Sequence, residues 1–250
     1  MTPGYPGFYF MISSVELVVR QFSDVIYTDF GLKFEAEIIQ GDLSRSNGPV
    51  GIIVSAARRI FPKDNIALPS FDSPTWGYRV EGELTLAYPH ETVPTPNGEK
   101  AKRLGPDTLH LRATSISAIV EALDGSPIGY DPSVFNNRAH ALCGHIGKIH
   151  EPDGLTAVRS LAVTLNKQAY TNTPLWVKAT FWGKQRDSAI QLLRPSTSAS
   201  IEGSLAFKNW DDSQDRRRVE VNLKASAFKI HNKERSNNVQ INTGLFHQAW

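Results

Sequence analysis

Short segments in which apolar and polar residues alternate, with turn residues between them, dominate this sequence. Tyr78–Leu86 and Leu109–Ala113 alternate strictly, Phe34–Ile38 does so over a shorter stretch, and Val50–Val54 is a β-branched run. Alternation with a period of two places one face of a segment in a core and the other in solvent, which is typical of a half-buried β-strand. The chain is therefore expected to be all-β with short helices, built as antiparallel barrels.

An internal repeat predicts two similar units. Segments on both sides of residue 137 share their order: Val80–Leu84 resembles Ile201–Leu205, Leu109–Ile119 resembles Val219–Ile230, and Gly48–Ser55 resembles Gly154–Ala162. The second unit also has a predicted helix at Gln185–Leu193 between its third and fourth strands. That element order is the order of a five-stranded OB barrel, so two tandem OB-fold barrels are expected, the N-terminal one degenerate.

The expected domain boundaries follow from the turn-rich stretches. A short helix is predicted near Val15–Ile26, because Val15, Val18, Val19 and Phe22 recur at helical spacing behind a capping-box pair, Ser13 and Glu16. The predicted organisation is an N-terminal extension with that helix at residues 1–33, a divergent OB-like domain at 34–122, a linker at 123–139, an OB domain at 140–231 and a flexible tail at 232–250.

Charge is distributed unevenly between the two halves. Residues 1–137 hold 11 Lys/Arg and 16 Asp/Glu, a balance of −5, whereas residues 138–250 hold 16 and 9, a balance of +7. A basic half beside an acidic half predicts that a polyanion contacts the C-terminal half only.

The most informative segment of that basic half is Leu175–Trp182. Trp176, Lys178, Thr180 and Trp182 share one face of the predicted strand, and the opposite face is apolar. Aromatic rings that stack on bases and basic groups that neutralise phosphates are what a single-stranded nucleic acid requires of its binding surface. A tryptophan that instead fills a core or a subunit interface is the alternative for each ring.

Three segments resemble the bacterial-type single-stranded-DNA-binding protein (SSB) family: Leu161–Thr164, Leu175–Leu193 and Ile201–Val221. The resemblance covers about residues 140–230 and implies an OB fold. It implies stacking positions at Trp176, Trp182 and Trp210, with phosphate contacts at Lys178, Lys184 and Lys208 beside them. It also implies a role in replication, repair or recombination, and a homo-oligomer, a homodimer if four barrels assemble from two chains.

The sequence departs from the family pattern at several positions. Lys167 stands near the place of a further aromatic, with Tyr170 close by, so both are candidate contacts. Arg216 and Arg218 follow an acidic turn, where they either grip phosphates or balance the aspartates. The end of the sequence lacks the acidic residues through which family members recruit partners.

An enzyme and a metal protein are the rival classes. His140, Cys143, His145 and His150 lie close in sequence, but their spacing matches none of the common zinc signatures. The chain is therefore expected to be no enzyme and to need no cofactor or metal. It is expected to be cytoplasmic and nucleoid-associated, without a membrane partner, and to bind single-stranded DNA or, alternatively, RNA. An OB-fold assembly module without strong DNA binding is the alternative function.

Overall fold

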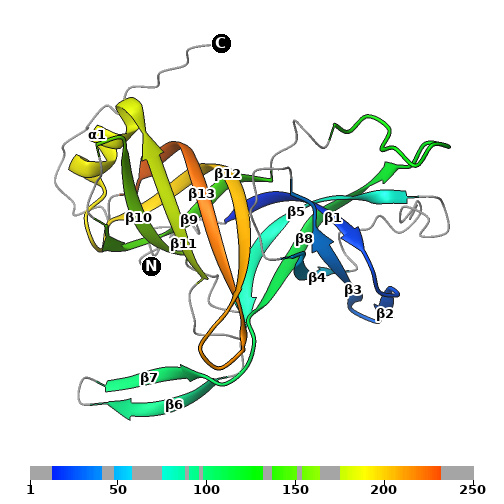
Figure 1. Cartoon of the computed structure of the whole chain (residues 1–250), viewed down its shortest axis with the longest axis horizontal. Helices are drawn as coiled ribbons and strands as arrows, with labels where there is room; N and C mark the ends of the chain where they lie inside the picture. Colours follow the sequence, from blue (N-terminus) through cyan, green and yellow to red (C-terminus); the bar gives the residue numbers. More distant parts are fainter. Residues whose placement is uncertain are drawn as a thin grey trace, which may run out of the picture.

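The computed structural model describes residues 13–40, 48–57, 75–87, 90–95, 98–131, 137–150, 154–163 and 175–231. Two β-barrels lie side by side (Figure 1). The N-terminal barrel consists of β1 (Ser14–Gln21), β3 (Gly31–Ile38), β4 (Val50–Ala57), β5 (Thr75–Ala87) and β8 (Thr108–Val120). The C-terminal barrel consists of β9 (Arg138–Ile149), β10 (Thr156–Val163), β11 (Leu175–Trp182), β12 (Ser198–Asp211) and β13 (Arg217–Ile230), with helix α1 (Gly183–Leu192) between β11 and β12.

Both barrels have the strand order of an OB fold. In the C-terminal barrel β9 pairs with both β10 and β12, and β10 pairs with β11. Strand β13 closes the barrel, because it pairs with β11 in parallel and with β12 in antiparallel orientation. In the N-terminal barrel β1, β3, β4, β8 and β5 close in the same order, again with one parallel pair, β4 with β8. The expected tandem OB architecture is thereby confirmed.

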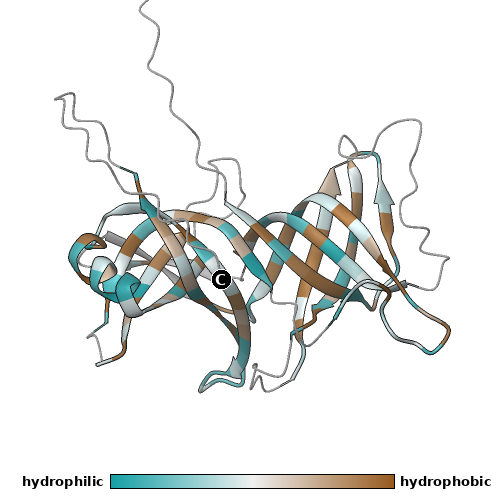
Figure 2. Ribbon diagram, turned by 90° about the horizontal axis from the view of Figure 1, so that it is seen from above, coloured by the Kyte–Doolittle hydropathy of each residue, from teal (hydrophilic) through white to brown (hydrophobic). Residues whose placement is uncertain are grey.

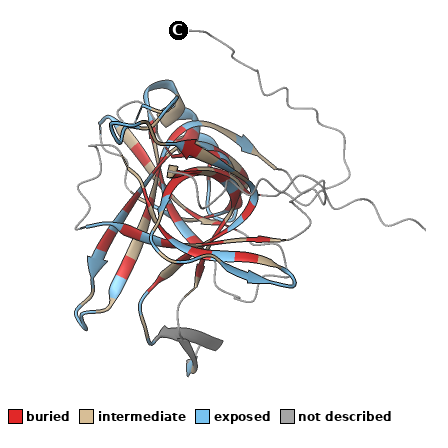
Figure 3. Cartoon of the chain, turned by 90° about the vertical axis from the view of Figure 1, so that its right-hand side faces the viewer, coloured by how far each residue is buried: buried red, intermediate tan, exposed pale blue. Residues whose placement is uncertain are grey.

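The alternation in the sequence produces the two cores. Apolar and polar residues form alternating bands along the strands (Figure 2), and the buried residues face the barrel interiors (Figure 3). Phe34 and Leu84 are among the largest fully buried side chains of the N-terminal barrel, and Phe181, Phe207 and Leu142 are among those of the C-terminal barrel.

Two small elements are added to the N-terminal barrel. Strand β2 (Ile26–Thr28) pairs with β3 and forms the end of the sheet. Strands β6 (His90–Thr95) and β7 (Gly98–Arg103) form a separate hairpin that projects from the barrel between β5 and β8 (Figure 1).

The helix expected near Val15–Ile26 is wrong, because Ser14–Gln21 is the first strand of the N-terminal barrel. Val15, Leu17 and Val19 point into the core with a period of two, but Val18 is buried as well. The backbone N–H of Val18 donates to the Asn137 side chain, so this strand is covered on its outer side too. Burial on both sides produced the spacing that resembled a helix.

The repeat was predicted with one strand out of place. Val50–Ala57 pairs in parallel with β8 as Leu175–Trp182 pairs with β13, so β4 corresponds to β11 and not to the strand at 156–163. The counterpart of that strand is β3. The shift arose because the first strand was assigned to a helix, so that Val50–Val54 was counted as the second strand when it belongs to the third. The fourth and fifth strands were matched correctly.

The Glu-Gly pair that both repeats share marks a β-bulge. Register shifts occur at Glu81/Gly82 and at Glu202/Gly203. A Cβ at Gly82 would lie 2.3 Å from the Arg112 carbonyl oxygen, and one at Gly203 would lie 2.1 Å from that of Lys224. Only glycine lets the neighbouring strand approach so closely. The shared Glu-Gly pair is therefore explained by the packing of the barrel and not by a ligand.

The barrels share one continuous sheet and a set of polar contacts between them, which we call the seam. Strand β1 pairs with β5 in its own barrel and with β9 in the other. Asn137, which is buried inside the expected linker, accepts from the Val18 N–H and donates to the Ile39 carbonyl. The Gln40 side chain makes two hydrogen bonds with the backbone of Phe207. These contacts hold the two barrels in a fixed orientation.

Within the described part of the chain, α1 is the single helix, and its ten residues are too few to cross a membrane.

Candidate nucleic-acid interface

The outer face of β11 carries the expected aromatic and basic stripe. Leu175, Val177, Ala179 and Phe181 are buried, and the residues between them point outward. Trp176 is 48% exposed and Trp182 is 41% exposed. Neither ring lies in the core of the barrel, so both remain accessible to a ligand.

Trp176 lies across the sheet over two small residues. Its partner on β10 is Ala162. On β9, one strand further, a Cβ at Gly147 would lie 2.5 and 2.6 Å from Cζ3 and Cη2 of the ring. The indole therefore rests directly on the Gly147 backbone, and its half-exposed surface is a platform of the kind on which a base can stack.

This contact predicts the effect of Gly147→Ala. The added methyl group cannot coexist with the present ring position, but the ring is the end of a flexible side chain and can move. We expect a folded protein with a melting temperature within a few degrees of the wild type and weaker binding of a single strand, by about five-fold or more if one stacked base is lost. Titration of an oligothymidine of about 8 nucleotides, a length within the roughly 4–16 that one OB fold covers, gives the affinity. Gly51→Ala in the other barrel, an exposed glycine with no atom of the described residues within 4 Å of the added carbon, is the matched control and should change neither quantity.

Trp182 is paired with a cation that the sequence analysis missed. The Lys224 ammonium group on β13 lies 5.6 Å from the centroid of the Trp182 ring. The register places Lys224 beside Thr180 of β11. Its exposed place in the alternating Val219–Ile230 strand was the available signal, but only the parallel pairing of β11 with β13 shows that it lies beside the tryptophan.

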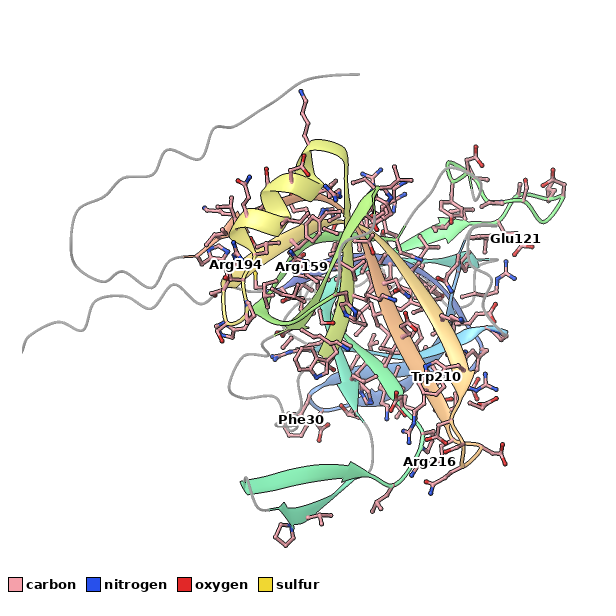
Figure 4. The ribbon with its side chains drawn as sticks, turned by 60° about the vertical axis from the view of Figure 1, so that its left-hand side comes forward. Phe30, Glu121, Arg159, Arg194, Trp210 and Arg216 are labelled. Atoms are coloured by element: carbon pink, nitrogen blue, oxygen red, sulfur yellow. The ribbon has the colours of Figure 1, made fainter. Side chains whose placement is uncertain are left out.

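Lys184 lies next to this ring in the chain. It is exposed in the first turn of α1, which begins directly after Trp182. The buried Arg159 supports the other end of the helix, where its guanidinium donates to the carbonyls of Ala189 and Leu193 (Figure 4). The helix, and with it Lys184, is thus fixed to the barrel.

Positive charge gathers around Lys178. Its neighbours in register are Ser160 on β10 and Asn222 on β13, which are both uncharged. His150 contacts Ser160 through its Nε2 at 3.0 Å. Burial lowers the pKa of His150, and the charges of Lys148, Lys178 and Arg159 lower it further. Lys148 and Lys178 are therefore near enough to His150 for their charges to act on its ring.

Trp210 and Lys208 extend the surface onto β12. Trp210 is 43% exposed and lies near the β12–β13 turn (Figure 4), and Lys208 is exposed two residues before it. Lys208 lies opposite Glu220 on β13. The order of strands places these two residues beyond β13 from the β11 stripe, so the three tryptophans are spread across the sheet.

Arg216 and Arg218, which were candidate phosphate contacts, take the other role that the sequence left open and balance aspartates. Arg218 is buried, 4% exposed, and its guanidinium donates to Asp107 and Asp212. Its place is in the seam between the barrels, and it offers no group to a phosphate. Arg216 is half-buried and its side chain also donates to Asp212, which holds the pKa of that carboxyl far below its usual range. The negative charge of Asp212 in the acidic turn is therefore neutralised by Arg216 and Arg218 of the protein itself.

Lys167 and Tyr170 lie outside the described residues. The cluster of histidines and Cys143 is not brought together as a ligand set in the part of the chain that the structure describes. Cys143 is buried, which raises the pKa of its thiol, while His145 is exposed. His140 lies instead near Glu16 and Glu81, a group whose ligand atoms are within 4.8 Å of one another. Arg79 lies 3.8 Å from Glu16, so ion pairing accounts for this group.

Fold and surface together define a tandem OB-fold protein with a tryptophan- and lysine-bearing face on its second barrel. Residues 142–231 match the model of the single-strand binding protein family, which confirms the resemblance expected from the tryptophan segments. This is a family of binding proteins, in agreement with the expectation that the chain is not an enzyme. A search of curated proteins gave no match.

A solved structure of the same fold supports this assignment. The wild-type single-stranded DNA binding protein from Thermus aquaticus is similar with a TM-score of 0.50 and 15% sequence identity, over 91% of this chain and 97% of that one. The likeness is one of fold and extends over both barrels. A small single-stranded DNA-binding protein from Streptomyces coelicolor has a TM-score of 0.32 and 14% identity, over 39% of this chain and 96% of that one.

Proposed function

We propose that this chain binds single-stranded DNA with little sequence preference, by stacking bases on Trp176, Trp182 and Trp210 and by neutralising phosphates. The observation that carries the proposal is the outer face of β11, where two half-exposed tryptophans flank an exposed lysine on a rigid sheet. Every base has a π-face, so stacking tolerates any sequence. The family match at residues 142–231 supports single-stranded DNA as the ligand.

The basic contacts that we propose are Lys178, Lys184 and Lys208, together with Lys224. All four are exposed on the C-terminal barrel, and Lys178 and Lys224 lie between the tryptophans in the register of the sheet. We infer from the same resemblance that the protein protects exposed strands during replication, repair or recombination. A homodimer, in which two chains supply four barrels, and association with the nucleoid are parts of the proposal as well.

Fluorescence anisotropy of labelled oligonucleotides tests this function. At equal salt, oligothymidine should bind much more tightly than a duplex of the same length, because paired bases cannot reach the rings. Oligouridine tests RNA as the main ligand, and tighter binding of oligouridine would replace DNA in the proposal. Absence of binding to all three at low salt would leave an assembly module as the better account.

Salt dependence provides a prediction for Lys224. For single strands the logarithm of the binding constant falls with the logarithm of salt concentration by about 0.7 for each phosphate that is neutralised. Lys224→Gln should therefore reduce the slope by about that amount and weaken binding uniformly across sequences. Lys229→Gln, an exposed lysine near the far end of the same strand, is the control. An unchanged slope in the Lys224 variant would remove this residue from the interface.

A further inference from the structure

Both barrels have an aromatic side chain at the corresponding place on the outer face of the sheet, but it comes from different strands. In the C-terminal barrel Trp176 of β11 lays its ring on Gly147 of β9. In the N-terminal barrel, Gly51 of β4 occupies the register position of Trp176, because Gly51 pairs with Glu37 as Trp176 pairs with Ala162. Phe22 stands at the position of Gly147, since its N–H donates to the carbonyl of Glu35.

Glycine and aromatic residue have therefore exchanged strands. Where the second barrel has an aromatic residue on β11 and a glycine on β9, the first has a glycine on β4 and an aromatic residue just after β1. Among the residues that the structure describes, no atom lies within 4 Å of a Cβ built on Gly51, so the immediate surroundings of this position are open there. Phe22 is 62% exposed, and it lies two residues after the outward-facing Arg20.

The surroundings of Phe22 offer cations and a hollow. Arg20 and Lys33 lie on the same outer face, and Arg112 of β8 occupies the register position of Lys224. Phe22 and Arg20 also line a hollow of about 320 Å³ together with Trp76 and Tyr78, and the Arg20 guanidinium lies 4.9 Å from the centroid of the Trp76 ring. A base stacked on Phe22 would have cations on either side for its flanking phosphates.

Three carboxylates limit the strength of this surface. Glu37 of β3 lies directly opposite Arg20, and Glu35 lies two residues after Lys33 on the outer face of the same strand, where the second barrel has Ala162 and Ser160. Asp24 lines the hollow beside Phe22. Their charges offset part of the local positive charge. The first barrel should consequently bind a strand more weakly than the second and only when the second already holds it.

We propose that the N-terminal barrel carries a secondary site for single-stranded nucleic acid, with Phe22 as its stacking ring and Arg20, Lys33 and Arg112 as its phosphate contacts. The inference rests on the proposed function of the C-terminal barrel, because the strand reaches Phe22 as an extension of the strand bound there. Long strands use both barrels, and short strands use the second barrel alone.

Phe22→Ala tests the site with oligothymidines of about 8 and about 32 nucleotides, lengths within and well beyond the roughly 4–16 nucleotides that one OB fold covers. We expect unchanged affinity for the short strand and an affinity for the long strand that falls by about five-fold or more. Phe30→Ala is the matched control, because Phe30 is 86% exposed in the turn between β2 and β3, outside the strand positions of that face. It should change neither affinity.

A fluorescent residue at position 22 tests the contact directly and does not rely on a change in affinity. Phe22→Trp is placed in a protein in which all five native tryptophans, Trp76, Trp176, Trp182, Trp210 and Trp250, are changed to phenylalanine, so that the introduced tryptophan is the one that emits. Quenching by the long strand and little by the short one is expected, whereas Phe30→Trp in the same background should stay unquenched. If the wild type binds both strands but neither Phe22 variant responds, the secondary site is wrong and the proposed function stands. If the wild type binds neither strand, the proposed function itself fails.

Discussion

Trp176→Ala is expected to weaken the binding of oligothymidine by about 5- to 150-fold, the equivalent of roughly 1–3 kcal/mol for one stacked base. The ring is half-exposed and rests on Gly147 outside the barrel core, so its loss removes a stacking surface and little of the packing. We expect the free energy of unfolding to fall by less than about 1 kcal/mol, since surface substitutions rarely cost more. Anisotropy titration and thermal melting measure the two effects on one sample.

Trp176→Phe is the matched control for this prediction. Phenylalanine keeps a π-face at the same place, so most of the affinity should remain. Wild-type affinity in a folded Trp176→Ala protein would contradict the stacking assignment. An equal loss in the alanine and phenylalanine variants would show that the indole acts in some way other than by stacking.

Arg218→Ala is expected to lower the free energy of unfolding by about 3–5 kcal/mol, because it leaves Asp107 buried without its cation. Asp107 and Arg218 come from different barrels, their charged groups are 3.1 Å apart, and their side chains are 0% and 5% exposed. Asp107 also accepts from the Val219 N–H, so the pair holds the seam at this point. For a chain of this size the melting temperature should fall by roughly 10 °C. Differential scanning calorimetry measures the shift.

Arg217→Ala, at the neighbouring position, is the matched control for Arg218→Ala. Arg217 is exposed and pairs with Asp211 at 2.9 Å, so Arg217→Ala should cost no more than about 1 kcal/mol. Well below the melting temperature, Arg218→Ala should bind a short oligothymidine within about two-fold of the wild type. A variant with normal stability and weakened binding would instead favour phosphate contact, the other role that the sequence left open for Arg218.

Arg218 shows why part of the candidate site escaped sequence reasoning. Three consecutive arginines after an acidic turn are equally suited to phosphates and to internal ion pairs, and the sequence does not tell which side chain turns inward. The decision comes from Asp107, which is far away in the chain but adjacent across the seam. Lys224 was missed for a related reason, because its proximity to Trp182 depends on a parallel strand pairing.

The predictions that succeeded depended on local patterns. The alternation of Leu175–Trp182 fixed which residues are inside and which are outside, and the structure has the same alternation. The Glu-Gly repeats located the fourth strand of each barrel, because a bulge glycine is required there in both. The prediction for the first strand failed because Val18 is buried as well as its core-facing neighbours, a tertiary effect that imitated helical spacing.

The measurement that tests the central claim most directly is a titration of the intrinsic tryptophan emission with poly-thymidine of graded length, with duplex DNA at the same salt as the control. Our account predicts strong quenching by the single strand, little by the duplex, and loss of most of that quenching when Trp176 and Trp182 are both changed to phenylalanine. Binding of the single strand with unchanged emission would show that the strand contacts another surface. That result would contradict the stacking face on the C-terminal barrel.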